Sequence, residues 1–158
     1  MNKRLRHTSH GFTLIELLLV IGIIAVLAVV VFVALDPAKR FVDARNSRRV
    51  SDAQFILTAV RQYVIDNGST LPTGLDTIEK QLGTGVSGCS LTYGVCSANT
   101  NYCLDMSSDL AKYLKSLPFD PKEGTSVKTH YTIQVDSNNI ITVRACDAEN
   151  NEEIVVSG

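Results

Sequence analysis

The chain has 158 residues, which is enough for one folded domain and an N-terminal anchor. Its formal net charge is −1, and this excludes the strongly basic footprint of a nucleic-acid-binding protein. The charge is unevenly spread, because residues 12–61 hold six basic and four acidic side chains whereas residues 62–158 hold six basic and twelve acidic ones. Such asymmetry can favour contact between the first part of one copy and the second part of another.

The N-terminal residues 1–11, MNKRLRHTSHG, contain basic side chains and no acidic ones. They resemble the positively charged start of an export signal, which is normally followed by an apolar core of about 7–15 residues. The apolar run here, residues 12–35, is longer than such a core, so we expect a retained membrane anchor. Residues 1–11 are then interpreted as a leader peptide that is removed.

Within residues 12–35 only Thr13 and Glu16 are clearly polar. As a helix this stretch would extend roughly 36 Å, which exceeds the ~30 Å hydrocarbon thickness of a bilayer. A charged carboxylate costs about 2.5–3.5 kcal/mol at the centre of a bilayer and less near its surface. The sequence therefore predicts a transmembrane helix, and it raises the question of what offsets the cost of Glu16.

Residues 36–66 are predicted to continue this helix in amphipathic form. At Asp36-Pro37 the helix could kink, or it could stop and restart with Asp36 as N-cap and Pro37 as the first helical residue. Asn67-Gly68 is a typical helix stop. One apolar stripe at helical spacing predicts the face that carries a folded head: Ala53, Ile56, Leu57, Val60 and Val64. Three oppositely charged pairs lie four residues apart and could interact along the surface: Asp36/Arg40, Lys39/Asp43 and Arg48/Asp52.

Residues 67–158 are predicted to form a globular, loop-rich head. The sequence DTIEKQL, residues 76–82, favours one or two helical turns with Asp76 and Glu79 as a capping pair. Residues 107–117, SSDLAKYLKSL, place their large apolar side chains on one helical face and predict a short helix. The following LPFDP ends that helix.

The C-terminal part of the head has the polarity pattern of an antiparallel sheet. Residues 130–135 and 140–145 alternate across the turn sequence DSNN and predict a β-hairpin. The segment EEIVVS, residues 152–157, predicts a third short strand.

The four cysteines all lie in the head, and an even number favours two disulfides in an oxidising compartment. Cys89, Cys96 and Cys103 follow a C-x6-C-x6-C spacing, and Cys146 lies further downstream. This spacing does not match the short C-x2-4-C pairs of zinc sites. Three pairings are possible from the sequence. Because disulfides persist in oxidising compartments, we expect the head to lie outside the membrane.

The segment GFTLIE, residues 11–16, lies behind a basic leader and at the start of the apolar run, and it resembles the class III signal of type IV pilins and pseudopilins. The resemblance implies that a prepilin peptidase cuts between Gly11 and Phe12 and that the new amine of Phe12 is N-methylated. It also implies that Glu16 neutralises the terminal amine of a neighbouring subunit, which would offset the cost of its buried charge. Glu16 is therefore expected to be poorly satisfied in a single chain.

The same resemblance implies an α+β, type IV pilin-like fold, in which a long N-terminal helix packs on a small antiparallel β-sheet head with short helices. It covers residues 1 to about 70 and is weaker beyond them, where LPFDP is similar to pieces of major pseudopilins. Two features depart from the family pattern. Gly22 and Pro37, which could loosen the helix, lie far apart, and the chain has four cysteines where many such proteins have one disulfide.

Other charged and polar groups are given structural interpretations. Four acidic side chains could offer calcium ligands, but without EF-hand-like spacing they are interpreted as solvated turn acids: Asp120, Asp136, Asp147 and Glu149. The basic side chains from Lys39 to Arg49 are interpreted as a solvated helix face rather than a site for lipid head groups or DNA. Asn67-Gly68-Ser69 matches a glycan-acceptor pattern but is interpreted as a turn. No metal, cofactor or specific nucleic-acid partner is predicted.

An enzyme is not expected, because His7 and His10 lie in the leader and His130 remains alone in a predicted strand, with no nucleophile elbow or phosphate loop in the sequence. The leading hypothesis is a structural pilin of a type IV pilus-like filament, held in the cytoplasmic membrane before assembly and extracellular afterwards. The alternatives are a pseudopilin of a type II secretion or DNA-uptake machine, and a membrane-anchored binding domain that never polymerises. The expected partners are further copies of the chain, a prepilin peptidase and an inner-membrane assembly platform.

Overall fold

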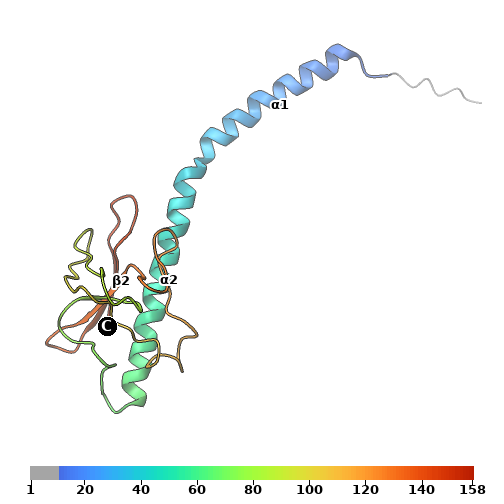
Figure 1. Ribbon diagram of the computed structural model, residues 1–158. Coiled ribbons are helices and arrows are strands. Elements are labelled where there is room, and N and C mark those ends of the chain that lie inside the picture. The colour runs from blue at the N-terminus through green and yellow to red at the C-terminus, as the bar shows by residue number, and fades with distance from the viewer. Residues whose placement is uncertain (1–10) are drawn as a thin grey trace, which may run out of the picture. The chain divides into compact units, whose positions relative to one another are not determined.

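The computed structural model describes residues 11–158 (Figure 1). The predicted leader lies outside the described residues except for Gly11. The chain forms two compact units, one ending at Arg40 and the other running from Phe41 to Gly158. The first is helical and the second is α+β.

The helical segment is interrupted once. Helix α1 runs over Leu14–Leu35 and helix α2 over Pro37–Asp66, with Asp36 between them in the left-handed conformation at φ 37°. The Asp36 carboxylate accepts a hydrogen bond from the backbone N–H of Lys39 at 3.3 Å. Pro37 starts α2, where its missing N–H is not needed. The stop and restart at Asp36-Pro37, one of the two predicted outcomes, is confirmed.

The inner face of α2 carries the core of the second unit. The four buried members of the predicted apolar stripe are Ala53, Ile56, Leu57 and Val60. The fifth member, Val64, is partly buried and packs against this core. The helix ends at Asn67-Gly68 as predicted, with Gly68 at φ 62°, a conformation that glycine adopts without steric cost. Of the three predicted ion pairs, Arg48–Asp52 forms at 3.5 Å. Arg40 instead donates to the Leu35 carbonyl at 3.3 Å.

A four-stranded antiparallel sheet with the order β1-β2-β3-β4 completes the second unit. The strands are β1, Lys80–Gln81; β2, Tyr131–Val135; β3, Ile141–Ala145; and β4, Ile154–Ser157. The predicted hairpin is β2–β3, and the predicted third strand is β4. The α+β, pilin-like fold class is therefore confirmed.

The two faces of the sheet are covered differently. On one face, Tyr131, Ile133 and Val143 join the buried side chains of α2 in a single core, and the Tyr131 hydroxyl donates to Asp52 at 3.1 Å. On the other face, Thr132 is buried and its hydroxyl lies 3.4 Å from the sulfur of Cys96. Part of the long loop between β1 and β2 therefore lies against the sheet face opposite α2, while Leu104, Met106 and Leu110 of the same loop join the core with α2.

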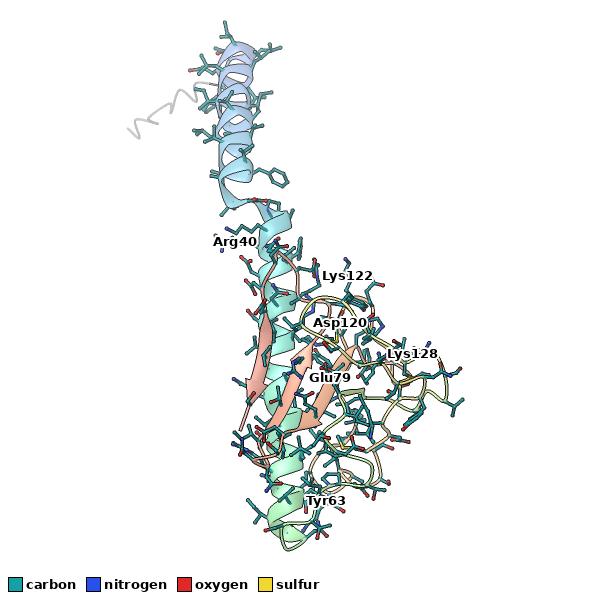
Figure 2. The ribbon with its side chains drawn as sticks, turned by 90° about the vertical axis from the view of Figure 1, so that its left-hand side faces the viewer. Arg40, Tyr63, Glu79, Asp120, Lys122 and Lys128 are labelled. Atoms are coloured by element: carbon teal, nitrogen blue, oxygen red, sulfur yellow. A yellow bond between two sulfur atoms is a disulfide. The ribbon has the colours of Figure 1, made fainter. Side chains whose placement is uncertain are left out.

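Two predicted short helices are wrong. Residues 76–82 form a bend and then β1, because pairing with β2 aligns Lys80 with Ile133. Glu79 (Figure 2) does not cap a helix; its carboxylate accepts a hydrogen bond from the Thr132 hydroxyl at 2.5 Å. Residues 107–117 form separate turns rather than a continuous helix, although Leu110 is buried as the pattern required. A segment this short has little helical stability of its own, so its tertiary contacts decide its conformation.

The disulfide pairings are Cys89–Cys103 and Cys96–Cys146, with Cα–Cα distances of 5.2 and 5.5 Å. The expectation of two disulfides is confirmed. The first closes the loop that follows β1, and the second fastens that loop to the end of β3. The loop has little regular structure, so covalent links compensate for the missing backbone ladders.

Removing either disulfide should destabilise the second unit, and the longer loop should matter more. The sequence separations are 14 and 50 residues, for which chain entropy gives about 3 and about 4 kcal/mol. The pair Cys96→Ala/Cys146→Ala should therefore unfold at lower temperature than Cys89→Ala/Cys103→Ala. Thermal unfolding of the full chain in detergent micelles, followed by near-ultraviolet circular dichroism, tests this order. Equal or reversed melting temperatures would show that local packing outweighs loop length.

Candidate functional site

Helix α1 presents apolar side chains on all sides. All of its residues are exposed in the single chain, including Leu14 at 81% and Phe32 at 68%. Its 22 residues would extend roughly 33 Å at 1.5 Å per residue. Among the described residues, one helical stretch, which begins with α1, is long and apolar enough to cross a membrane. A helix that is apolar all round requires lipid or other apolar helices as its surroundings.

The start of α1 is a complete capping box formed by Thr13 and Glu16. The Glu16 backbone N–H donates to the Thr13 hydroxyl oxygen at 3.3 Å. In return, the Glu16 carboxylate oxygen Oε2 accepts from the Thr13 backbone N–H at 2.9 Å and from the Thr13 hydroxyl at 2.7 Å. The carboxylate is thus held against the first turn of the helix, where the helix dipole favours negative charge.

The structure places the predicted processing residues directly before this box. Gly11 and Phe12 precede the helix, and the Phe12 side chain is 82% exposed. No heavy atom from elsewhere in the described chain lies within 4 Å of the position that a Cβ of Gly11 would take. The peptide bond between Gly11 and Phe12 is therefore accessible to another protein.

The expectation that Glu16 is poorly satisfied in a single chain needs correction. Its Oε2 atom accepts two hydrogen bonds from Thr13, so part of its hydrogen-bonding capacity is satisfied within the chain. Within residues 11–158, however, no cationic group lies within 4.0 Å of this carboxylate. Thr13 is the residue that the sequence analysis missed, although the spacing T-x-x-E is the signature of a capping box.

Comparison with known proteins addresses the same segment. Residues 6–32 match the prokaryotic N-terminal methylation motif. The N-terminal segment of the chain therefore carries a type IV pilin-like methylation motif. This motif is the class III signal typical of type IV pilins and pseudopilins, so the predicted resemblance is confirmed for this segment. A search of curated proteins and a search of solved structures found no match.

The match has direct biochemical implications. A pilin-like methylation motif implies processing by a prepilin peptidase and the assembly of subunits that is typical of the pilin family. Pilin-like proteins are typically structural and non-enzymatic. The matched residues end within α1, so the motif bears on the N-terminal segment rather than on the sheet and loops of the second unit.

Within the second unit, a buried ion pair joins α2 to the LPFDP segment. The Arg49 side chain is fully buried and donates to both carboxylate oxygens of Asp120, at 2.6 and 3.2 Å. Asp120 (Figure 2) also accepts from the backbone N–H groups of Lys122 and Glu123 at 2.8 and 3.0 Å. A planar guanidinium matches a carboxylate in this two-bond geometry. The buried charges therefore satisfy each other.

A second carboxylate extends this network toward the end of the sheet. Glu149 accepts two hydrogen bonds from Arg45, both at 2.6 Å, and one from Arg49 at 3.0 Å. The Arg45 guanidinium lowers the pKa of Glu149 from 4.5 to about 2; burial opposes this shift and Arg49 adds to it. Asn46 completes the cluster by donating to the Glu149 carbonyl oxygen at 2.9 Å.

This network overturns two sequence interpretations. Asp120 is 1% exposed and Glu149 is partly buried in an ion pair, so neither is a solvated turn acid. Arg45 and Arg49 belong to the interior network rather than to a solvated basic face, whereas Arg48 remains exposed. Among the described residues, no group of three or more histidine, cysteine, aspartate or glutamate side chains is arranged to hold a metal ion.

His130 lies in a hydrogen-bonded group with Asp147 and Tyr93. Its Nδ1 atom lies 2.5 Å from a carboxylate oxygen of Asp147, and the Tyr93 hydroxyl donates to the other oxygen at 2.9 Å. The hydrogen bond with Asp147 raises the pKa of His130. All four cysteines are in disulfides, so a reactive Cys–His pair is excluded in the oxidised protein.

Breaking the buried pair should cost far more than changing its exposed neighbour. Arg49→Met leaves the Asp120 carboxylate buried without its cation, and we expect a loss of about 3–5 kcal/mol in unfolding free energy. Arg48→Met, one residue earlier, removes a longer pair at 3.5 Å made by an exposed guanidinium, while Asp52 keeps its hydrogen bond from the Tyr131 hydroxyl, so it should cost only about 1 kcal/mol. Denaturant unfolding of both variants measures the difference. Similar losses in the two variants would contradict the importance of burial.

The Glu149 network predicts a specific acid sensitivity. Because its folded-state pKa is depressed, the stability that Glu149 contributes is fully present above pH 4.5 and is lost as pH falls toward about 2. The stability difference between the native chain and Glu149→Gln should therefore be constant near neutral pH and should shrink over that acidic range. Unfolding free energies of both proteins between pH 2 and 7 provide the measurement. A difference independent of pH would contradict the assigned ion pairs.

Proposed function

We propose that this chain is a structural pilin of a type IV pilus-like surface filament, which polymerises through α1 after leader cleavage. The observation that carries the proposal is the fully exposed apolar helix α1 that starts directly at a class III processing motif. Before assembly the bilayer covers that helix, and in the filament other copies of α1 cover it. The role is structural rather than enzymatic.

The geometry of the N-terminus supports the processing steps. Cleavage between Gly11 and Phe12 would create a new amine on an exposed residue just before α1. Glu16 lies one helical turn beyond Phe12, so its carboxylate and the amine of a neighbouring copy can be brought together by a small shift along the helix axis. Charge neutralisation inside an apolar helix cluster offsets the cost of burying each group alone.

The outer face of α2 also supports contact with other copies. Every residue of one stripe on this face is exposed, with spacings that alternate between three and four residues: Phe41, Ala44, Arg48, Ser51, Phe55, Thr58, Gln62 and Ile65. Phe41 and Phe55 are 66% and 58% exposed. The apolar members of the stripe, Phe41, Ala44, Phe55 and Ile65, offer contact area to a neighbouring helix, and the polar members between them can remain hydrated.

The alternative as a secretion or DNA-uptake pseudopilin uses the same N-terminal chemistry. The two disulfides favour a filament that is exposed to the outside, where covalent links resist unfolding. Prepilin peptidase and an inner-membrane assembly platform are the proposed partners in either case. Recovery of the chain in long fibres sheared from cells would support the pilin, whereas its restriction to the envelope would support the pseudopilin.

Intact mass of the protein in sheared surface material tests processing directly. The expected chain begins at Phe12, carries one extra methyl group, and lacks four hydrogens because two disulfides have formed. A chain that retains residues 1–11 and occurs only in membranes would overturn the filament proposal. It would favour a membrane-anchored domain that does not polymerise.

Replacing Glu16 tests its role in assembly. Glu16→Ala should preserve expression and membrane insertion but lower filament yield at least tenfold, since an unpaired amine in an apolar environment costs more than about 1.4 kcal/mol. Thr13→Ala is the matched control, because it breaks the capping box but keeps the carboxylate. Fibre yield by shearing and immunoblotting measures both. If Thr13→Ala reduces yield as much as Glu16→Ala does, helix capping rather than charge neutralisation explains the motif.

A further inference from the structure

The two edges of the sheet differ in how they are protected. At the β1 edge, the following segment pairs with residues near Leu104: the Leu104 N–H donates to the Gln81 carbonyl at 2.7 Å, and the Gly83 N–H donates to the Leu104 carbonyl at 3.1 Å. At the other edge, β4 pairs only with β3 among the described strands. One edge is therefore covered by the chain itself and the other is open.

The register of β4 shows which backbone groups point outward. Ile141 and Gly158 exchange two backbone hydrogen bonds, at 3.1 and 2.9 Å. Because bonded and non-bonded pairs alternate in an antiparallel ladder, Val156 and Ile154 also bond to β3. The N–H and C=O groups of Val155 and Ser157 then face away from the sheet. Within the described chain, no other backbone group pairs with them.

A groove runs along this open edge. It has a volume of about 490 Å³ and is lined by Val50 and Gln54 of α2 together with residues 152–157. Val155 is 45% exposed and Val50 is 37% exposed. The strand has the sequence IVVS, without proline or an internal charge, so it lacks the usual features that block edge pairing apart from its short length.

The charged side chains of the groove define the chemistry of its occupant. Glu152 and Glu153 are the charged residues in its lining. Both are exposed, and Glu152 already accepts a hydrogen bond from Asn46 at 2.8 Å. The matching strand of a second copy, residues 152–158, contains no lysine or arginine and so offers no complementary charge. A basic partner fits the groove better than another β4 does.

We propose that the open edge of β4 binds an extended basic peptide by strand addition. The backbone of the peptide pairs with Val155 and Ser157. Because side chains alternate along a strand, its apolar side chains contact Val50 on the α2 side of the sheet, and its lysines or arginines lie beside Glu153 on the opposite side. Main-chain pairing at a sheet edge supplies affinity while side-chain contacts supply selectivity. This binding site does not depend on the proposed filament function.

The test uses the full chain in detergent micelles and a capped synthetic peptide with alternating valine and lysine. Binding is measured by calorimetry, and amide hydrogen exchange locates the site. We expect the amides of Val155 and Ser157 to exchange at least about tenfold more slowly with peptide bound. A glutamate-for-lysine peptide should bind at least about tenfold more weakly. A peptide methylated on alternate backbone nitrogens should not bind, because it keeps the side chains but cannot pair.

Two variants connect this binding to the edge. Val155→Pro removes an outward N–H without removing a bond to β3, a position where proline is tolerated, and it should abolish binding. Glu153→Lys should weaken binding of the basic peptide by about three- to tenfold. Glu123→Lys, an exposed carboxylate outside the groove, is the matched control and should have little effect.

Several results would overturn the proposal. These are absence of binding by the valine–lysine peptide, equal binding of the acidic peptide, or protection of amides elsewhere than on β4. Protection of Val155 and Ser157 that rises with protein concentration in the absence of peptide would assign the edge to a second copy instead.

Discussion

The molecule depends on one constraint, which is that α1 buries none of its side chains within residues 11–158. All of its residues are exposed, and transfer of such surface from water is worth about 25 cal/mol per Å² of apolar area. In the proposed function, a bilayer meets this demand for a newly made chain and neighbouring copies meet it in the filament. Under that proposal the same helix serves first as a membrane anchor and then as a filament core, and cleavage at the methylation motif at its start separates the two states.

The second unit is organised around α2, whose two faces have different tasks. The inner stripe forms the core with the sheet, and the buried pair between Arg49 and Asp120 joins positions 71 residues apart. The outer stripe keeps Phe41 and Phe55 exposed. If the outer face of α2 is to contact other copies, its inner face must be firmly attached to the sheet and loops of the second unit. The Arg49 pair and the Glu149 network provide directional attachment that apolar packing alone would not.

The sequence predicted those parts of the fold that depend on local periodicity. The stripe on α2, the hairpin β2–β3 and strand β4 follow from spacing, since one buried face imposes a period on the residues that form it. The turns at 107–117 were wrongly predicted as a helix because the same apolar spacing suits separate turns. Local patterns could not predict the pairing of Arg49 with Asp120 or the pairing of the cysteines, because these contacts join segments that are separated in the sequence. At the N-terminus the methylation motif was recognised from the sequence, but Glu16 was expected to be poorly satisfied in a single chain because the T-x-x-E spacing was not interpreted as a capping box.

Those bonds refine the role proposed for Glu16. Both hydrogen bonds from Thr13 end on Oε2, and within residues 11–158 the other carboxylate oxygen, Oε1, accepts none of the hydrogen bonds found. Because a carboxylate has about four acceptor positions, Glu16 can keep its capping box and still receive the amine of a neighbouring copy. The capping box lowers the free-energy cost of a charge at the start of an apolar helix. The Oε1 atom still has acceptor positions for a cationic group. In the proposed filament, Oε2 therefore caps the helix of its own chain and Oε1 receives the amine of a neighbouring copy.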